Sequence, residues 1–116
     1  MKRKEIYMIK FSIKKTTGTS DYEYQSSTES YLRIDGEKNH KLRFIGLENI
    51  IFEKFVEELE GLKIFNWDKK IDVDHLQEDS WSLLLCSPVD FLFMESSSFD
   101  HEYEKIYSLI KKYDLD

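Results

Sequence analysis

The chain has little of the residues that cross-link or interrupt a fold, with one cysteine, one proline and four glycines. A single cysteine, Cys86, excludes an internal disulfide, and its apolar neighbours Leu83–Leu85 predict a buried, unreactive thiol in a reducing compartment. The scarcity of proline and glycine excludes a linker-rich or low-complexity protein. A hydrophobic share of 41% and an aromatic share of 15% argue against a disordered chain.

Long apolar segments are also missing. No 18 apolar residues run together, so we expect no membrane-spanning helix. The basic residues 2–4 are followed by a four-residue apolar run, Ile6–Ile9, which is too short for the apolar region of a signal peptide. At this length the chain fits a single domain over residues 1–116, and we predict a cytoplasmic location.

Charge is unevenly distributed along the chain, although the total is only −6. Residues 1–45 contain ten Lys and Arg against six Asp and Glu, whereas residues 46–116 contain seven against seventeen. The acidic residues crowd residues 48–60 and residues 68–79. A surface of one sign accelerates association with an oppositely charged partner. The pattern therefore indicates a binding protein with a basic partner, and the negative total disfavours nucleic acid.

Alternating apolar and polar residues predict strands in the first half of the chain. Apolar side chains occupy every second position of residues 7–14, which places them on one face of a strand. Residues 16–21 are rich in turn formers and predict a hairpin. A second, longer strand is predicted from about Tyr22 to Ile34, and its polar middle suits an exposed edge or a bulge. After a turn at residues 35–39, Leu42 and Phe44 predict a short third strand.

Helical spacing predicts the next element. Apolar residues recur at intervals of four, four and three at Ile51, Phe55, Leu59 and Leu62. Gly61 is placed to end this helix in a left-handed conformation. A second helix starts near Ser98, with Ser97 or Ser98 as its cap, because apolar residues again follow helical spacing at Tyr103, Ile106, Tyr107, Ile110 and Tyr113.

Two further strands are predicted between the helices, over residues 81–86 and 91–95, and residues 63–67 are compatible with a short one. Residues 81–86 have little polar face, which predicts cover on both sides. The fold class is therefore α+β, a mainly antiparallel sheet of about five strands with two helices in the order β-β-β-α-β-β-α.

Candidate metal ligands gather in one acidic segment, at Asp72, Asp74, His75, Glu78 and Asp79. Carboxylate and imidazole groups ligate metals, so the segment is open to three interpretations: a solvated loop, a partner-binding loop or a metal site. An EF-hand calcium loop does not fit, because the fifth, sixth and twelfth positions from Asp72 are Leu76, Gln77 and Leu83. We expect no metal ion and no cofactor.

No residue set forms a complete active site. The three histidines, His40, His75 and His101, are dispersed and are interpreted as ordinary surface residues. No glycine pattern marks a nucleophilic serine, and isolated glycines do not make a phosphate-binding loop. We therefore expect no enzymatic activity, and the weakest alternative is a metal-dependent hydrolase that uses Asp72, Asp74 and His75.

The C-terminal half carries a recognisable succession of features. Trp67 follows the first helix, and an acidic loop, the Asp79-Ser80-Trp81 strand, a hairpin and a final helix come after it. Over about residues 50–113 this resembles small bacterial immunity proteins encoded beside polymorphic toxins, including those of contact-dependent growth inhibition systems. The resemblance implies a protein that acts by binding a cognate toxin domain, commonly a nuclease with a basic groove, and it carries over no catalytic residues.

The predicted function is neutralisation of such a toxin by direct stoichiometric binding. The partner-binding residues that we predict are acidic except for one tryptophan: Glu57, Trp67, Asp68, Asp72, Asp74, Glu78 and Asp79. An alternative is a phage or mobile-element inhibitor, or a scaffold protein, with an acidic binding face. The polar second strand leaves a homodimer, or strand addition with a partner, open.

Overall fold

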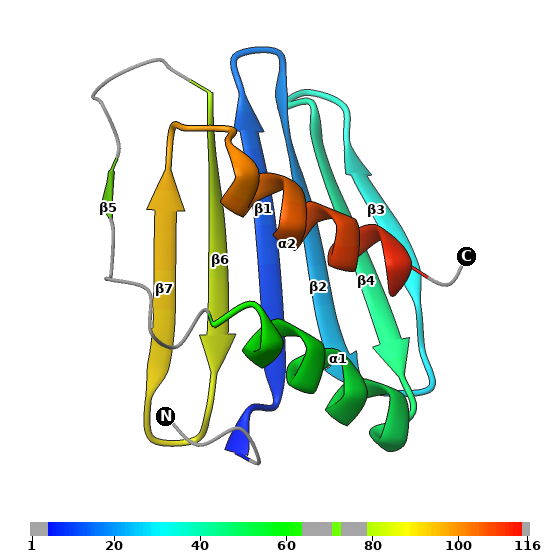
Figure 1. Cartoon of the computed structure of the whole chain (residues 1–116). Helices are drawn as coiled ribbons and strands as arrows, with labels where there is room; N and C mark the ends of the chain where they lie inside the picture. The colour runs from blue at the N-terminus through cyan, green and yellow to red at the C-terminus, as the bar shows by residue number, and fades with distance from the viewer. Residues whose placement is uncertain (1–4, 64–70, 73–78, 115–116) are drawn as a thin grey trace.

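The computed structural model describes residues 5–63, 71–72 and 79–114 and has two layers, a sheet and a pair of helices (Figure 1). Both helices lie on the same face of the sheet. The described elements, in chain order, are β1 (Met8–Lys15), β2 (Gly18–Ser26), β3 (Tyr31–Asp35), β4 (His40–Leu47), α1 (Asn49–Gly61), β5 (Ile71–Asp72), β6 (Ser80–Cys86), β7 (Phe91–Ser96) and α2 (His101–Lys112). In the described part of the chain, both helices are too short and too polar to cross a bilayer.

The α+β class is confirmed, but the strand count and order differ from the prediction. The described strands form one sheet in the order β3-β4-β2-β1-β6-β7-β5. Most pairs are antiparallel, whereas β2 pairs with β4, and β5 with β7, in parallel. The N-terminal half of the chain therefore builds one side of the sheet and the C-terminal half builds the other.

The predicted single strand over residues 22–34 is wrong, because the chain forms two strands there. It leaves β2 after Ser26, passes over the end of β4 and returns as β3 on the far side of that strand. The serine-rich link stabilises this route, since Ser27 Oγ accepts from Glu29 N at 3.1 Å and Ser30 Oγ accepts from Gly46 N at 3.0 Å. A Cβ atom at Gly46 would lie 2.2 Å from Glu29 O, so only glycine fits under the crossing link.

The sheet edge is also different from the expected one. β2 lies inside the sheet, between β4 and β1, and β3 forms the edge. Leu32 and Ile34 of β3 are 51% and 61% exposed.

The core lies between the sheet and the helices. Ile9, Phe11 and Ile13 point from β1 toward the helices, as the alternation predicts. α1 adds its apolar stripe to this core, and α2 adds its own, with the buried residues Phe52, Phe55, Val56, Leu59, Ile106 and Ile110. Phe55 joins the layers, because its ring stacks on Tyr113 at 4.5 Å and meets Tyr24 edge-on at 4.7 Å.

The predicted helix ends need two corrections. α1 continues through Gly61, and the left-handed conformation falls two residues later, on Lys63 with φ of 62°. α2 is capped by Asp100 rather than by Ser97 or Ser98, since Asp100 Oδ1 accepts from Glu102 N at 3.1 Å. The Ser98 carbonyl instead accepts from Trp81 Nε1 at 2.8 Å. Residues 64–67 of the suggested short strand lie outside the described residues.

The second face of the sheet has no helix over it in the described part of the chain (Figure 1). The expected cover on both sides is therefore wrong for most of β6: Trp81, Leu83 and Leu85 are buried on the helix face, whereas Leu84 and Cys86 on the other face are half-buried. His40 on this face is not an ordinary surface residue, because its Nε2 lies 2.6 Å from Oδ2 of the buried Asp21. Cys86 is half-buried rather than buried as the sequence predicted, and this partial burial raises the pKa of its thiol.

Candidate functional site

A groove of about 680 Å³ lies beside the first turns of α1, between this helix, the residues that lead into β1 and the end of β2. We call it the α1 groove. Its floor is apolar and consists of Ile6, Phe52 and Val56, all of which are buried. Its rim is polar, except for one aromatic ring, and consists of Tyr7, Gln25, Ser26, Asn49, Glu53 and Glu57. The groove therefore combines an apolar base with an acidic margin.

Helical geometry explains the two halves of this lining. Phe52 and Val56 are four residues apart on the face of α1 that packs against the sheet. Glu53 and Glu57 follow them by one position each, which places both carboxylates on the exposed flank of the same two turns. The apolar and acidic parts of the groove are thus built by one repeating pattern in the helix.

Backbone and side-chain hydrogen bonds hold the rim in place. The Ser26 hydroxyl donates to Asn49 Oδ1, which ties the end of β2 to the start of α1. The Tyr7 amide donates to the Cys86 carbonyl at 2.9 Å, so the backbone of Tyr7 is fixed against β6. The Tyr7 side chain is nevertheless 53% exposed. An exposed aromatic ring on a fixed backbone is a preorganised contact group.

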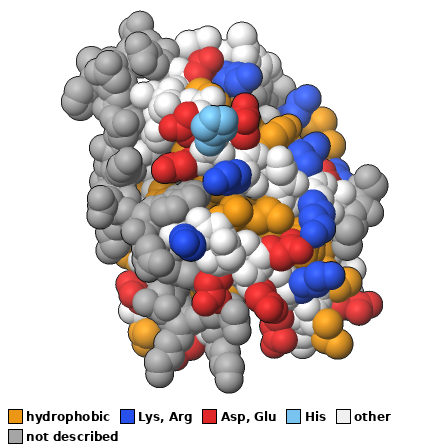
Figure 2. Space-filling view, in the orientation of Figure 1, with side chains coloured by type: hydrophobic (Ala, Val, Ile, Leu, Met, Phe, Trp, Pro, Cys, Tyr) orange, Lys and Arg blue, Asp and Glu red, His pale blue; other side chains and the backbone are white. Residues whose placement is uncertain are grey.

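Glu53 and Glu57 form a ridge between two hollows, and we call this pair the acidic ridge. On one side of the ridge is the α1 groove, and on the other side is a hollow of about 490 Å³ that is also lined by Ile50, Lys54 and Glu58. Both carboxylates are exposed, and neither has an ion-pair partner among the described residues. Figure 2 shows Asp and Glu side chains around α1 on this face and Lys and Arg side chains along its β3 side.

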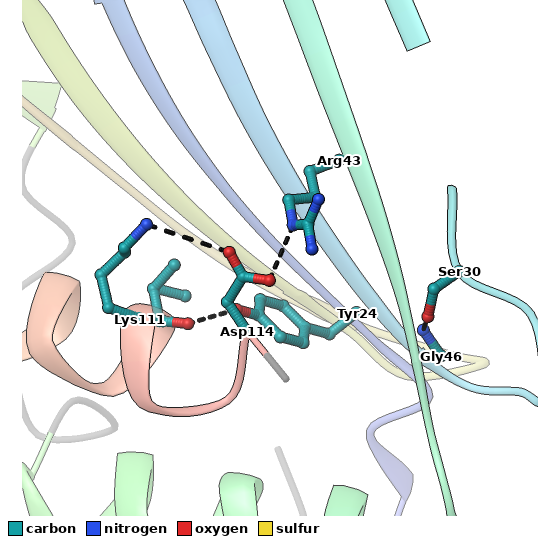
Figure 3. A network of polar contacts seen from close by, with 7 residues as sticks. Tyr24, Ser30, Arg43, Gly46, Lys111 and Asp114 are labelled. Carbon is teal, nitrogen blue, oxygen red and sulfur yellow. Dashed lines mark hydrogen bonds and ion pairs between the residues drawn. The ribbon is translucent and has the colours of Figure 1, made fainter. Parts of the chain in front are cut away.

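A second polar site lies at the C-terminal end of α2 and has the opposite character. Arg43 Nε donates to Asp114 Oδ1 at 2.7 Å, and Lys111 Nζ lies 3.9 Å from the other Asp114 oxygen (Figure 3). Lys111 Nζ also lies 5.8 Å from the centre of the Tyr22 ring. Tyr24 donates its hydroxyl to the Ile110 carbonyl beside them. We call these residues the Arg43 cluster; its charges are paired within the chain.

The tyrosines of this region are held in their neutral form. Burial, followed by the charge of Tyr107, raises the pKa of Tyr22 to about 12. Burial also raises the pKa of Tyr24. The Arg43 cluster is thus a structural contact between β4, β2 and α2, and Tyr22 and Tyr24 stay neutral in it near pH 7.

The structure does not bring the two fully described predicted site residues together. Glu57 lies on the α1 groove, whereas Asp79 Oδ1 accepts from Thr16 N at 3.1 Å beyond the far end of β1. The eight residues of β1 separate these ends by about 26 Å at the usual rise of a strand. Asp72 lies in β5 at the sheet edge. Trp67, Asp68, Asp74 and Glu78 lie outside the described residues, so a single binding surface through residues 68–79 stays a prediction.

Sequence reasoning missed most of the α1 groove, which needs three segments far apart in the chain. The sequence places Glu53 only within the acidic segment of residues 48–60, and Tyr7 only within the alternating segment of residues 7–14. The available signal was the position of Glu53 and Glu57 directly after the buried Phe52 and Val56. Nothing in the sequence indicates that Tyr7 and Ser26 border the same hollow.

Comparisons with protein-family models, with curated proteins and with solved structures found no match for this chain. Among the described residues, no three His, Cys, Asp or Glu side chains gather as a metal site would require. Two members of the suggested metal set, Asp74 and His75, lie outside those residues.

Proposed function

We propose that this protein is an immunity protein that neutralises a cognate cationic toxin domain by stoichiometric binding in the bacterial cytoplasm. The acidic ridge is the observation that carries this proposal. Two exposed carboxylates lie four residues apart beside a hollow, and no described cation neutralises them. Like charges at this helical spacing repel, so a basic partner would relieve an unfavourable interaction.

Electrostatics fits the kinetics that toxin neutralisation requires. A toxin that grips nucleic acid presents Lys and Arg to the phosphate backbone. An acidic surface attracts such a groove and accelerates association, and salt weakens this steering. A standard interface buries roughly 1,600 Å² in total, which is well within the reach of a chain with 7677 Å² of accessible surface.

Co-expression with the adjacent open reading frame tests the proposal. We expect that frame to be toxic alone, to be tolerated with this chain, and to co-purify with it in a fixed ratio on size-exclusion chromatography. Charge removal by Glu53→Gln and Glu57→Gln should slow association, most strongly at low salt. Failure of both rescue and co-purification would contradict the proposal, and an adjacent phage structural gene would favour the inhibitor or scaffold alternative.

A further inference from the structure

The geometry points to an arginine side chain of the partner as the occupant of the α1 groove. This inference rests on the proposed function, because it names the chemical group by which a cationic partner would be held. Three features of the groove support it: an apolar floor, two carboxylates that pair with no described cation, and an exposed aromatic ring.

The apolar floor fits the stem of a long cationic side chain. Ile6, Phe52 and Val56 are buried and offer a surface against which methylene groups can pack. Lys and Arg side chains routinely bury their stems in this way while their charged ends stay near water. A volume of about 680 Å³ accommodates one such side chain together with part of its backbone.

The chemistry of the rim favours an arginine over a lysine side chain as the occupant. Two carboxylates one helical turn apart present several acceptor oxygens, and a guanidinium group has five donors in a planar fork. A guanidinium group also stacks on aromatic rings, and the exposed Tyr7 ring borders the same hollow. The ammonium group of lysine is a compact, strongly hydrated charge, so it would make fewer hydrogen bonds to the two carboxylates and would not stack on the Tyr7 ring.

Other described cations near the ridge do not occupy the α1 groove. Lys54 lines the hollow on the other side of the acidic ridge. Lys112 is engaged by Glu58 at 2.7 Å. The α1 groove therefore presents its carboxylates to a cation from outside the described part of the chain, and arginine is among the residue types most enriched at the energetic centres of protein interfaces.

A titration with a small arginine derivative tests this inference directly. The full chain, labelled with 15N, is titrated with N-acetyl-arginine methylamide and followed by two-dimensional NMR. We expect shifts centred on Tyr7, Asn49 and Glu53, with a dissociation constant on the order of millimolar, as is typical of one small fragment. The lysine analogue should bind several-fold more weakly, and the uncharged citrulline analogue should not bind.

Two double variants separate a specific groove from general attraction to an acidic protein. Glu53→Gln with Glu57→Gln removes two charges from the groove and should weaken binding of the arginine derivative about tenfold. Glu48→Gln with Glu60→Gln removes the same charge from positions at the ends of the same helix, outside the groove, and should change it less than twofold. Tyr7→Ser should remove most of the preference for arginine over lysine.

The results would overturn the inference if the shifts lay elsewhere, if both double variants weakened binding equally, or if citrulline bound as well as arginine. The toxin assays give a separate result. A toxin still captured at full rate by the groove variant would leave the proposed function standing and reject the arginine site. Specific binding of the arginine derivative without any captured toxin would support the site and reject the proposed function.

Discussion

The α1 groove lies beside the first turns of α1, the Arg43 cluster lies at the C-terminal end of α2, and the two sites use carboxylates differently. In the Arg43 cluster, Asp114 is largely buried and contacts two cations from its own chain. In the α1 groove, Glu53 and Glu57 are exposed and have no described cation partner. Carboxylates therefore stabilise the fold in the Arg43 cluster and are left exposed in the α1 groove.

Because of this difference, charge-removing variants of the two sites should have different effects on the stability of the fold. Removing Arg43 from the cluster leaves the partly buried Asp114 carboxylate with a weaker contact to a cation, which is costly. Removing a charge from the acidic ridge leaves no described cation without a partner, because Glu53 and Glu57 are exposed and unpaired among the described residues. Variants of the Arg43 cluster and of the acidic ridge should therefore differ in the sign as well as the size of their effect on stability.

The largest effect is expected from Arg43→Met. The substitution keeps much of the side-chain volume but leaves Asp114 with only the longer contact to Lys111, so we expect a loss of about 1–3 kcal/mol in the free energy of unfolding. Urea unfolding followed by circular dichroism measures this. Arg33→Met on the exposed edge strand β3 is the control and should change stability by less than about 0.5 kcal/mol. Equal effects of the two variants would show that the pairing is unimportant.

The buried tyrosine of the same cluster should make the protein sensitive to alkali. Burial raises the pKa of Tyr24, so folding favours the neutral form of this side chain. The resulting contribution to the free energy of unfolding is fully present below pH 10 and is lost as the pH rises above that value. One such group lowers the free energy of unfolding by about 1.4 kcal/mol per pH unit in that range. Tyr24→Phe should flatten the pH dependence measured between pH 9.5 and pH 11, at a cost of about 1 kcal/mol at pH 7 from the lost hydrogen bond to Ile110. An unchanged slope would contradict this.

A smaller effect is expected at the contact between the two helices. Lys112 donates to Glu58 at 2.7 Å, and this hydrogen bond lowers the pKa of the Glu58 carboxyl. The contribution of this ion pair to the free energy of unfolding is therefore present above pH 4.5 and is lost as the pH falls through the lowered pKa of Glu58. Because Lys112 is exposed, Lys112→Met should cost only about 0.5 kcal/mol at pH 7, and less at pH 3. Lys105→Met on the same helix is the control, and a cost that does not depend on pH would contradict the ion-pair explanation.

The smallest change in stability, with the opposite sign, is expected at the acidic ridge. Glu53→Gln with Glu57→Gln removes repulsion between like charges four residues apart, so stability should be unchanged or rise by up to about 0.5 kcal/mol. Thermal unfolding of the variant beside the wild type measures this. A clear loss of stability would show that the ridge serves the fold and would remove the contrast on which the proposed function rests.

Local patterns in the sequence predicted the elements whose signal is repeated along a short segment. Alternation identified β1, and helical spacing identified both α1 and the body of α2. These elements each bury one regular face, so their neighbours along the chain reveal which side faces the core. The α+β class followed from their order.

Contacts between distant segments could not be predicted in the same way. The break between β2 and β3 depends on Ser30 reaching Gly46, and the Arg43 cluster joins residues 71 positions apart. The α1 groove likewise needs Tyr7, Ser26 and Glu53 to meet. Such contacts depend on the order in which the chain adds strands to the sheet, and local periodicity in the sequence does not predict that order.

The parallel pairing of β2 with β4 has a consequence for where a ligand can bind. Two strands that run in the same direction finish at a common border, so Ser26 and Leu47 arrive side by side and α1 starts two residues after Leu47. Had the chain made a simple hairpin there, the helix would begin at the opposite border, far from Ser26. The detour through residues 27–39 thus decides where the α1 groove forms, and substitutions in the groove can change its chemistry without rerouting the backbone.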